Sequence, residues 1–251
     1  MTIDAYSHCS DIKFRPVEDV LACMASASVD KAVLVQQLGQ FDNTYLRSAV
    51  QQRPTSLIAV AMINPGDIDA RKQLANIAGQ SEFRGIRMTS EMLVAAPEFA
   101  QEVLERNLHL VLYCPEGTAP ILKLLDVLAH GHGSGLIVIT HMGTPKVADA
   151  SLVRGRELAE CASLPRISLT LSGSAMACRF PHAPLVEFYR EMVSLFGPKR
   201  VQWGSNYPVL GDETDYARDL ALLLENFWQF DPLSLSDIAG NTASRMWFSR
   251  D

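Results

Sequence analysis

The sequence predicts an α/β protein that folds as a (β/α)8 TIM barrel, a single domain over residues 1–251 with an extra C-terminal helix. Three observations favour this fold. Eight short runs rich in β-branched residues recur about 28 residues apart, which is the length of one strand, one helix and two loops. Segments with apolar residues at helical spacing separate the runs. No glycine-rich phosphate turn follows the first run, so an open doubly wound sheet is disfavoured.

Each predicted strand is short, and several are apolar on both faces. This is expected when helices cover one side of a parallel sheet and the other side packs into a barrel. The predicted strands are residues 2–6, 31–36, 56–62, 84–88, 109–113, 136–140, 167–172 and 200–204.

The predicted helices alternate with these strands. The first opens with Pro16 and has acidic residues in its first turn, both favourable at a helix N-terminus. The predicted helices are residues 16–28, 42–53, 67–80, 96–106, 119–129, 148–161, 184–196 and 213–227, with one or two more over 231–248.

Composition narrows the function classes. The chain is 48% apolar and 20% charged, with a net charge of −6, which argues against disorder and against nucleic-acid or anionic-membrane binding. The five cysteines form no C-x-x-C pair, and no signal segment or membrane span is evident. We therefore expect reduced thiols, a cytoplasmic protein and a small-molecule substrate, and homo-oligomerisation is left open.

The residues that follow the predicted strands are polar, and active sites of such barrels lie at the carboxyl ends of the strands. Alternation places Asp4, Tyr6 and His8 on one side of the first strand. We expect His8, His141 and Asn206 to converge at the mouth of the barrel. The further candidates for substrate contact are Arg87, Tyr113, Glu116, Ser172 and Tyr207.

Arg87 is the best candidate for binding an anion, because its planar fork suits a carboxylate. A substrate carboxylate and a structural salt bridge to Asp4 or Glu116 are both open. Glu116 is a base, an acid or the partner of Arg87. Cys114 is a less favoured nucleophile, because a buried cysteine is usually inert packing.

Most of the other histidines are expected to be structural. His130 and His132 precede a strand and so belong to the opposite, stability face of the barrel. His109 begins a strand. For His182, in the loop after the seventh strand, two interpretations are equally open: a side chain that reaches the mouth of the barrel, or an ordinary loop residue.

Six segments, in order along nearly the whole chain, resemble the amidohydrolase-related branch (amidohydrolase 2) of the amidohydrolase superfamily. They are IDAYSH at 3–8, FRGIR at 83–87, ITHMGTP at 139–145, LSG at 171–173, WGSNYP at 203–208 and AGNTA at 239–243. The resemblance implies a TIM barrel with its site at the strand ends. It also implies a hydrolase of lactones and related compounds, metal-dependent or metal-independent, or a metal-dependent decarboxylase.

Two positions depart from that family's pattern. Tyr6 stands where a histidine is usual, and Asn206 stands where an aspartate is usual. A catalytic zinc typically has three protein ligands, and His8 and His141 supply only two strong ones. We therefore expect no cofactor, with a weakly bound divalent metal such as zinc at His8 and His141 as the alternative.

Three readings of the function follow. In the first, a metal-independent hydrolase uses His141 or His8 as acid and base, Arg87 as anion anchor, and Asn206 and Tyr6 as donors to an oxyanion. In the second, the same pocket carries out a non-hydrolytic lyase, isomerase or decarboxylase reaction. In the third, the chain is a pseudoenzyme that binds a small molecule.

Overall fold

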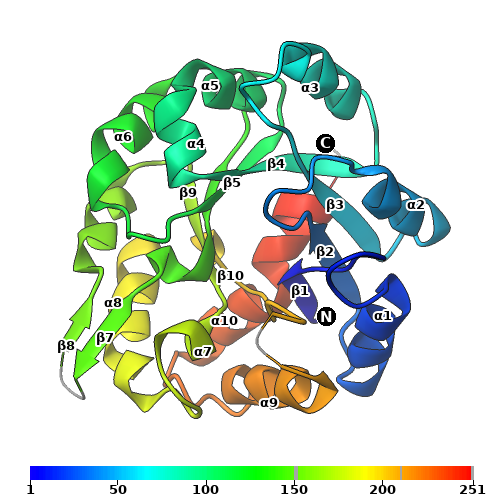
Figure 1. Ribbon diagram of the computed structural model, residues 1–251. Helices are drawn as coiled ribbons and strands as arrows, with labels where there is room; N and C mark the ends of the chain where they lie inside the picture. The colour runs from blue at the N-terminus through cyan, green and yellow to red at the C-terminus, as the bar shows by residue number, and fades with distance from the viewer. Residues whose placement is uncertain (150–151, 210, 250–251) are drawn as a thin grey trace.

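The computed structural model describes residues 1–149, 152–209 and 211–249. Eight parallel strands form the barrel, in the order β1-β2-β3-β4-β5-β6-β9-β10, and helices surround them (Figure 1). The predicted (β/α)8 barrel is confirmed. Its strands are β1 (Ile3–Ser7), β2 (Lys31–Val35), β3 (Leu57–Met62), β4 (Phe83–Thr89), β5 (His109–Tyr113), β6 (Ile137–Ile139), β9 (Ile167–Leu171) and β10 (Val201–Trp203).

Helices follow most strands, near the predicted positions. The α-helices are α1 (Val17–Ser26), α2 (Thr44–Gln52), α3 (Ala70–Ala78), α4 (Ser90–Ala95), α5 (Pro97–Glu105), α6 (Leu122–His130), α7 (Ser174–Ala177), α8 (Val186–Phe196), α9 (Glu213–Leu224) and α10 (Pro232–Ser236). Short 3-10 segments are η1 (Ala119–Ile121), η2 (Thr140–Gly143), η3 (Arg156–Ser163), η4 (Ala183–Leu185) and η5 (Pro198–Arg200), and η6 (Asp237–Asn241) and η7 (Ser244–Phe248) are π-helical. In the described residues, no helix combines the length and the apolar character needed to cross a bilayer.

The predicted helix over residues 148–161 is wrong for most of its length. An antiparallel hairpin of β7 (Lys146–Asp149) and β8 (Leu152–Arg154) comes first, and only η3 is helical. Gly155 separates the two with a φ of 110°, a conformation that a right-handed helix cannot contain. The apolar spacing that suggested a helix comes from Leu158 and Cys161, which are buried in η3.

The C-terminal segment, red in Figure 1, closes one end of the barrel. Trp247 is 1% exposed and packs with the apolar residues that line the barrel interior. Its indole nitrogen donates to Gln202 Oε1 at 2.8 Å, and its ring meets His109 edge to face at 4.9 Å. The C-terminal segment therefore covers the amino-terminal end of the barrel, opposite the carboxyl ends of the strands.

The junction between the first and last strands, residues 4–8 and 204–207, is joined largely through one carboxylate, and we call it the seam. Asp4 accepts hydrogen bonds from Tyr6 N at 3.1 Å, from Ser205 N at 2.9 Å and from Ser205 Oγ at 2.6 Å. Two backbone hydrogen bonds also cross the junction. Asn206 N donates to Tyr6 O at 2.8 Å, and His8 N donates to Tyr207 O at 2.7 Å. Gly204 permits this approach, because a Cβ there would lie 2.5 Å from Tyr6 Cβ.

The prediction that Asp4 shares a side with Tyr6 and His8 is wrong. The register of β1 against β2 shifts between Asp4 and Ser7, so simple alternation fails there. Tyr6 packs with the barrel interior, whereas Asp4 lies beside Tyr216 of α9. This irregularity separates the structural carboxylate from the side chains of the mouth.

Replacing Asp4 by alanine tests the importance of the seam. The Asp4→Ala variant leaves three buried donors without an acceptor, so we expect the free energy of unfolding to fall by about 3 kcal/mol. Urea denaturation measures this loss. Asp126→Ala, at a side chain that is 63% exposed, should change stability by no more than about 0.5 kcal/mol. Equal stability of the two variants would contradict the role assigned to Asp4.

Candidate active site

Tyr6 and His8 bring the first strand into the mouth of the barrel. His8 Nδ1 lies 2.7 Å from Val35 O, and because a carbonyl only accepts, this nitrogen carries the proton. Nε2 of His8 therefore keeps its lone pair. The Tyr6 ring stands edge to face between the two predicted histidines, with ring centroids 4.9 Å from His8 and 5.0 Å from His141.

His141 follows β6 in the left-handed region, with a φ of 54°. Its Nδ1 lies 2.9 Å from Ser172 Oγ, and its ring meets Tyr113 at 5.6 Å. Gly173 is needed beside it, because a Cβ there would come within 2.6 Å of His141 Nδ1. The sequence thus fixes the orientation of His141 from two neighbouring strands, β6 and β9.

Arg87 enters the same cluster from β4. It is 5% exposed, its Nη1 donates to Gln36 O at 2.6 Å, and its guanidinium lies 5.7 Å from the centre of the Tyr6 ring. Neither Asp4 nor Glu116 pairs with it, and among the described residues it forms no ion pair. The buried Arg87 Nε and Tyr6 Oη have no hydrogen-bond partner in the described structure.

The electrostatics of the cluster favour neutral histidines. Burial lowers the pKa of His8 to about 3, and the positive charge of Arg87 adds to this. The same two causes lower the pKa of His141 to about 3. Burial raises the pKa of Tyr6, against the effect of Arg87. At neutral pH the site therefore contains two uncharged imidazoles, one phenol and one fixed positive charge.

Asn206 completes the cluster from the seam. It adopts a φ of 56°, and its side chain lies near enough to His8 to raise that pKa slightly against the larger effect of burial. Its Nδ2 also lies 3.9 Å from Met176 Sδ. The structure thus brings together seven of the predicted site residues: Tyr6, His8, Arg87, Tyr113, His141, Ser172 and Asn206.

The structure does not bring Glu116 or Tyr207 to this cluster. Glu116 has a 75% exposed side chain that pairs with Lys146 at 2.9 Å. Tyr207 is 5% exposed and packs against Tyr216 of α9 at 5.9 Å. Cys114 is fully buried, and burial raises the pKa of its thiol to about 12, so it is no ready nucleophile.

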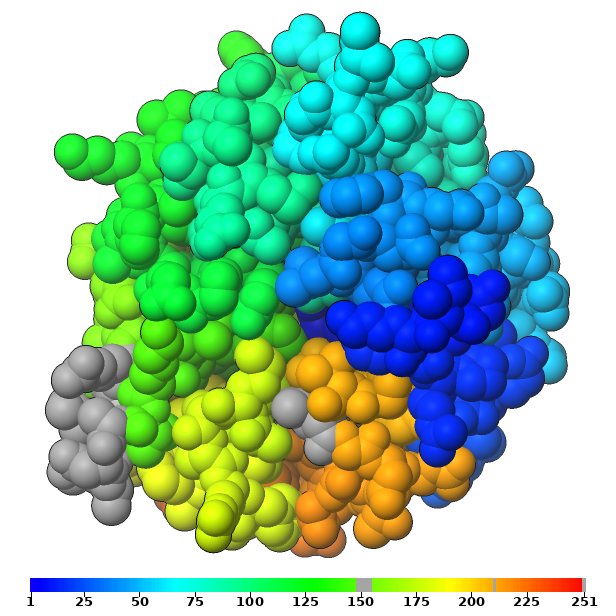
Figure 2. All heavy atoms as spheres, viewed as in Figure 1, coloured from blue at the N-terminus to red at the C-terminus, as the bar shows by residue number. Residues whose placement is uncertain are grey.

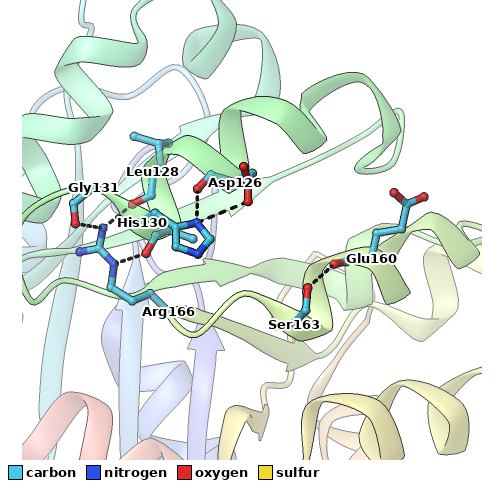
Figure 3. Close-up of polar contacts among 8 residues, drawn as sticks. Asp126, Leu128, His130, Gly131, Glu160, Ser163 and Arg166 are labelled. Carbon is cyan, nitrogen blue, oxygen red and sulfur yellow. Dashed lines mark hydrogen bonds and ion pairs between the residues drawn. The ribbon is translucent and has the colours of Figure 1, made fainter.

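Three of the other histidines, His109, His130 and His182, contact neighbouring groups outside this cluster. Figure 3 shows that the segment containing His130 ends α6, where Arg166 donates to the carbonyls of Leu128 and Gly131. His130 itself faces Asp126 across 3.4 Å. His109 bonds Met246 O at 2.8 Å, and Nδ1 of His182 bonds Cys178 O at 2.8 Å.

The donor set does not fit a tightly bound divalent metal. Within the described ranges, no group of three or more His, Cys, Asp or Glu side chains could hold such an ion. His8 and His141 are the two imidazoles of the mouth, and the positive charge of Arg87 that disfavours their protonation also disfavours a bound cation. Tyr6, whose pKa burial raises, is a poor anionic ligand.

Sequence reasoning missed Phe14, whose ring stacks on His8 with centroids 5.3 Å apart and planes at 25°. Phe14 lies in the loop after β1, where no periodic pattern assigns a direction to a side chain. In Figure 2 the dark-blue N-terminal segment reaches the centre of the face that carries the loops after the strands. Because its ring stacks on His8, Phe14 is part of the wall of the site.

The low pKa values predict an acid-sensitive fold. Both histidines are neutral when folded and protonate near pH 6.5 when unfolded. Between pH 7 and pH 5 the unfolded chain takes up protons that the folded protein does not, so the free energy of unfolding should fall by about 2 kcal/mol for each histidine. Their contribution is intact above pH 6.5 and is lost progressively as the pH falls toward about 3.

Denaturant titrations across this range, on His8→Gln and His141→Gln, measure the effect. Each substitution should make stability less dependent on pH, while His132→Gln, at an exposed position, should leave the dependence unchanged. If the free energy of unfolding depends on pH as steeply in both site variants as in the wild type, the neutral, buried state of these rings is contradicted.

Comparisons with known proteins agree with this architecture. A family model described as Amidohydrolase matches residues 4–248. A curated relative, L-fucono-1,5-lactonase of Burkholderia ambifaria, is 28% identical over 217 residues, which are 81% of this chain and 74% of the relative.

Solved structures share the fold across the whole chain. A probable 2-pyrone-4,6-dicarboxylic acid hydrolase from Acinetobacter baumannii with citric acid bound superposes with a TM-score of 0.76 at 17% identity, covering 98% of each chain. For 5-carboxyvanillate decarboxylase from Sphingomonas paucimobilis the TM-score is 0.68 at 15% identity, again covering 98% of each chain. Because the family match spans nearly the whole sequence, the chain belongs to the amidohydrolase family.

Proposed function

We propose that the protein is a hydrolase of a small carbonyl compound, a lactone, cyclic ester or amide, that works without a tightly bound metal. The observation that carries the proposal is the pair of buried donors without partners, Arg87 Nε and Tyr6 Oη, beside two neutral imidazoles. Leaving such a donor unpaired costs about 1–3 kcal/mol. A substrate oxygen that accepts from both would offset that cost. The relatives named as a lactonase and a pyrone hydrolase support this class of reaction.

Binding a substrate anion at Arg87 prepares the bases of the site. The charge of Arg87 is one cause of the low pKa values of His8 and His141. A carboxylate on that guanidinium neutralises the charge and raises both pKa values toward the range in which an imidazole accepts a proton from water. The citric acid bound to the Acinetobacter baumannii protein supports a carboxylate ligand for this fold.

The hydrolytic step follows from these positions. His141, oriented by Ser172, takes a proton from water while the water oxygen bonds to the carbonyl carbon. Tyr6, Asn206 and Arg87 Nε donate hydrogen bonds to the oxygen on which negative charge develops, while the other arm of the Arg87 guanidinium binds the substrate carboxylate. The ring carbon–oxygen bond then breaks, and the proton on His141 passes to the leaving alkoxide. The product is a hydroxy acid, and no step needs a carboxylate base at position 206.

A lyase, isomerase or decarboxylase reaction is the second candidate. Asn206 favours it, because an amide cannot act as the base that activates water, and such reactions need none. The structural likeness to 5-carboxyvanillate decarboxylase is compatible with it. Solvent labelled with ¹⁸O distinguishes the two, since hydrolysis places one solvent oxygen in the product. A ligand that raises the melting temperature and is recovered unchanged would indicate the third, non-catalytic reading.

The test is turnover of a panel of lactones and cyclic esters, including L-fucono-1,5-lactone and 2-pyrone-4,6-dicarboxylate, by protein freed of metal. We expect at least one compound to be hydrolysed, and His141→Ala to lower kcat by at least about 100-fold because the base is lost. His132→Ala, on the opposite face, should keep wild-type activity. A chelator should have no effect.

Two results would contradict the proposal. Activity that disappears with a chelator and returns with zinc would refute metal independence. Full activity of His141→Ala would refute its role as the base.

A further inference from the structure

The His8 imidazole is enclosed on several sides, and His8 is only 2% exposed. Val35 O takes its Nδ1 proton, the edge of Tyr6 lies against it, and Phe14 stacks on its face. The ring of a substrate cannot stack on the face of the His8 imidazole that Phe14 covers unless Phe14 moves. In the described structure His8, a candidate catalytic residue, is therefore covered by other side chains.

Among these neighbours, Phe14 is the group that can move. Val35 and Tyr6 belong to β2 and β1 and are buried in the barrel. Phe14 is only partly buried and lies in a loop between β1 and α1, with the Lys13 ammonium 5.5 Å from its ring centre. Displacing Phe14 therefore disturbs no strand of the barrel.

The loop that carries Phe14 is a closed unit. Ser10 N donates to Arg15 O at 2.9 Å, which ties the two ends of residues 10–15 together. Ser10 Oγ accepts from Lys13 N and Phe14 N, both at 2.9 Å. Because these hydrogen bonds lie within the loop, residues 10–15 can swing about their ends without breaking any of them.

We propose that Phe14 is a gate and a specificity-determining residue: it leaves His8 when a substrate binds, and the ring of the substrate takes its place against the imidazole. The second half rests on the proposed hydrolysis of cyclic substrates, whereas the gating of His8 does not. Phe14 presents an apolar ring to His8. We therefore expect the substrate to present the flat or apolar face of a ring of similar size. The size of the side chain at position 14 then sets which rings are admitted.

Chemical labelling tests the gate independently of activity. Diethyl pyrocarbonate acylates the unprotonated Nε2 of accessible histidines, and peptide mass spectrometry gives the rate at each one. We expect His8 to be labelled about tenfold faster in Phe14→Ala than in the wild type, because a covering group is gone. Ile12→Ala is the matched control, since Ile12 lies in the same loop and is 75% exposed. Its His8 should react at the wild-type rate.

His109 serves as an internal control for folding. It is bonded through Nε2 at the closed end of the barrel, so it should stay slow in every variant. If the labelling of His109 becomes fast in Phe14→Ala, that variant has lost its fold. The smaller change Phe14→Leu then tests the gate, and we expect faster labelling of His8 in it than in the wild type. The gate is refuted if His8 is labelled at the wild-type rate while His109 stays slow. This outcome is judged in Phe14→Ala if that variant is folded, and otherwise in Phe14→Leu.

Turnover separates the gate from the proposed reaction. We expect Phe14→Ala to raise kcat/KM for a lactone with a bulky ring substituent, relative to the unsubstituted lactone, by about tenfold. Faster labelling with no lactone turned over by any form of the protein supports the gate and refutes the lactone proposal. Turnover of lactones with unchanged labelling and selectivity refutes the gate alone.

Discussion

The Asp4 carboxylate joins the first and last strands of the barrel, and the geometry of the site depends on that junction. It accepts hydrogen bonds from β1 and from the segment after β10. Tyr6 and His8 follow Asp4 by two and four residues, and Asn206 follows its partner Ser205 directly. A small displacement of the seam would therefore move three side chains of the mouth at once.

Neighbouring strands hold the buried polar cluster of the mouth in place. Strand ends fix each group: Val35 O orients His8, Ser172 orients His141, and Gln36 O holds one arm of Arg87. The remaining donors of Arg87 and Tyr6 are left without partners. Such groups cost stability in the free protein, and a ligand that satisfies them regains it. This arrangement is typical of a site that binds an anion or a carbonyl oxygen.

Much of this architecture could be predicted from the sequence. The eight strands are visible as apolar runs, and the side chains at their carboxyl ends include seven residues of the cluster. Alternation failed at Asp4, because the shift in register between Asp4 and Ser7 leaves no mark in the sequence pattern. A position just after a strand was also no sufficient guide for Tyr207, which packs against Tyr216 of α9.

Loops account for the other differences. Glu116 lies in a turn that is closed by a hydrogen bond from Gly117 N to Cys114 O at 3.1 Å. In this turn the Glu116 side chain lies in solvent beside Lys146. The 148–161 segment has helical spacing only in its second part, and Gly155 interrupts it. Phe14 depends on the folded loop that Ser10 organises, which neither periodicity nor composition reveals.

In our proposal, Arg87 Nε and Tyr6 Oη are the two donors that form hydrogen bonds with the substrate. A crystal structure with the hydroxy acid product of the best lactone substrate tests it most directly. We expect a ligand oxygen within about 3 Å of both donors, which is ordinary hydrogen-bond distance. A product bound elsewhere, with both donors still unpaired, would contradict it.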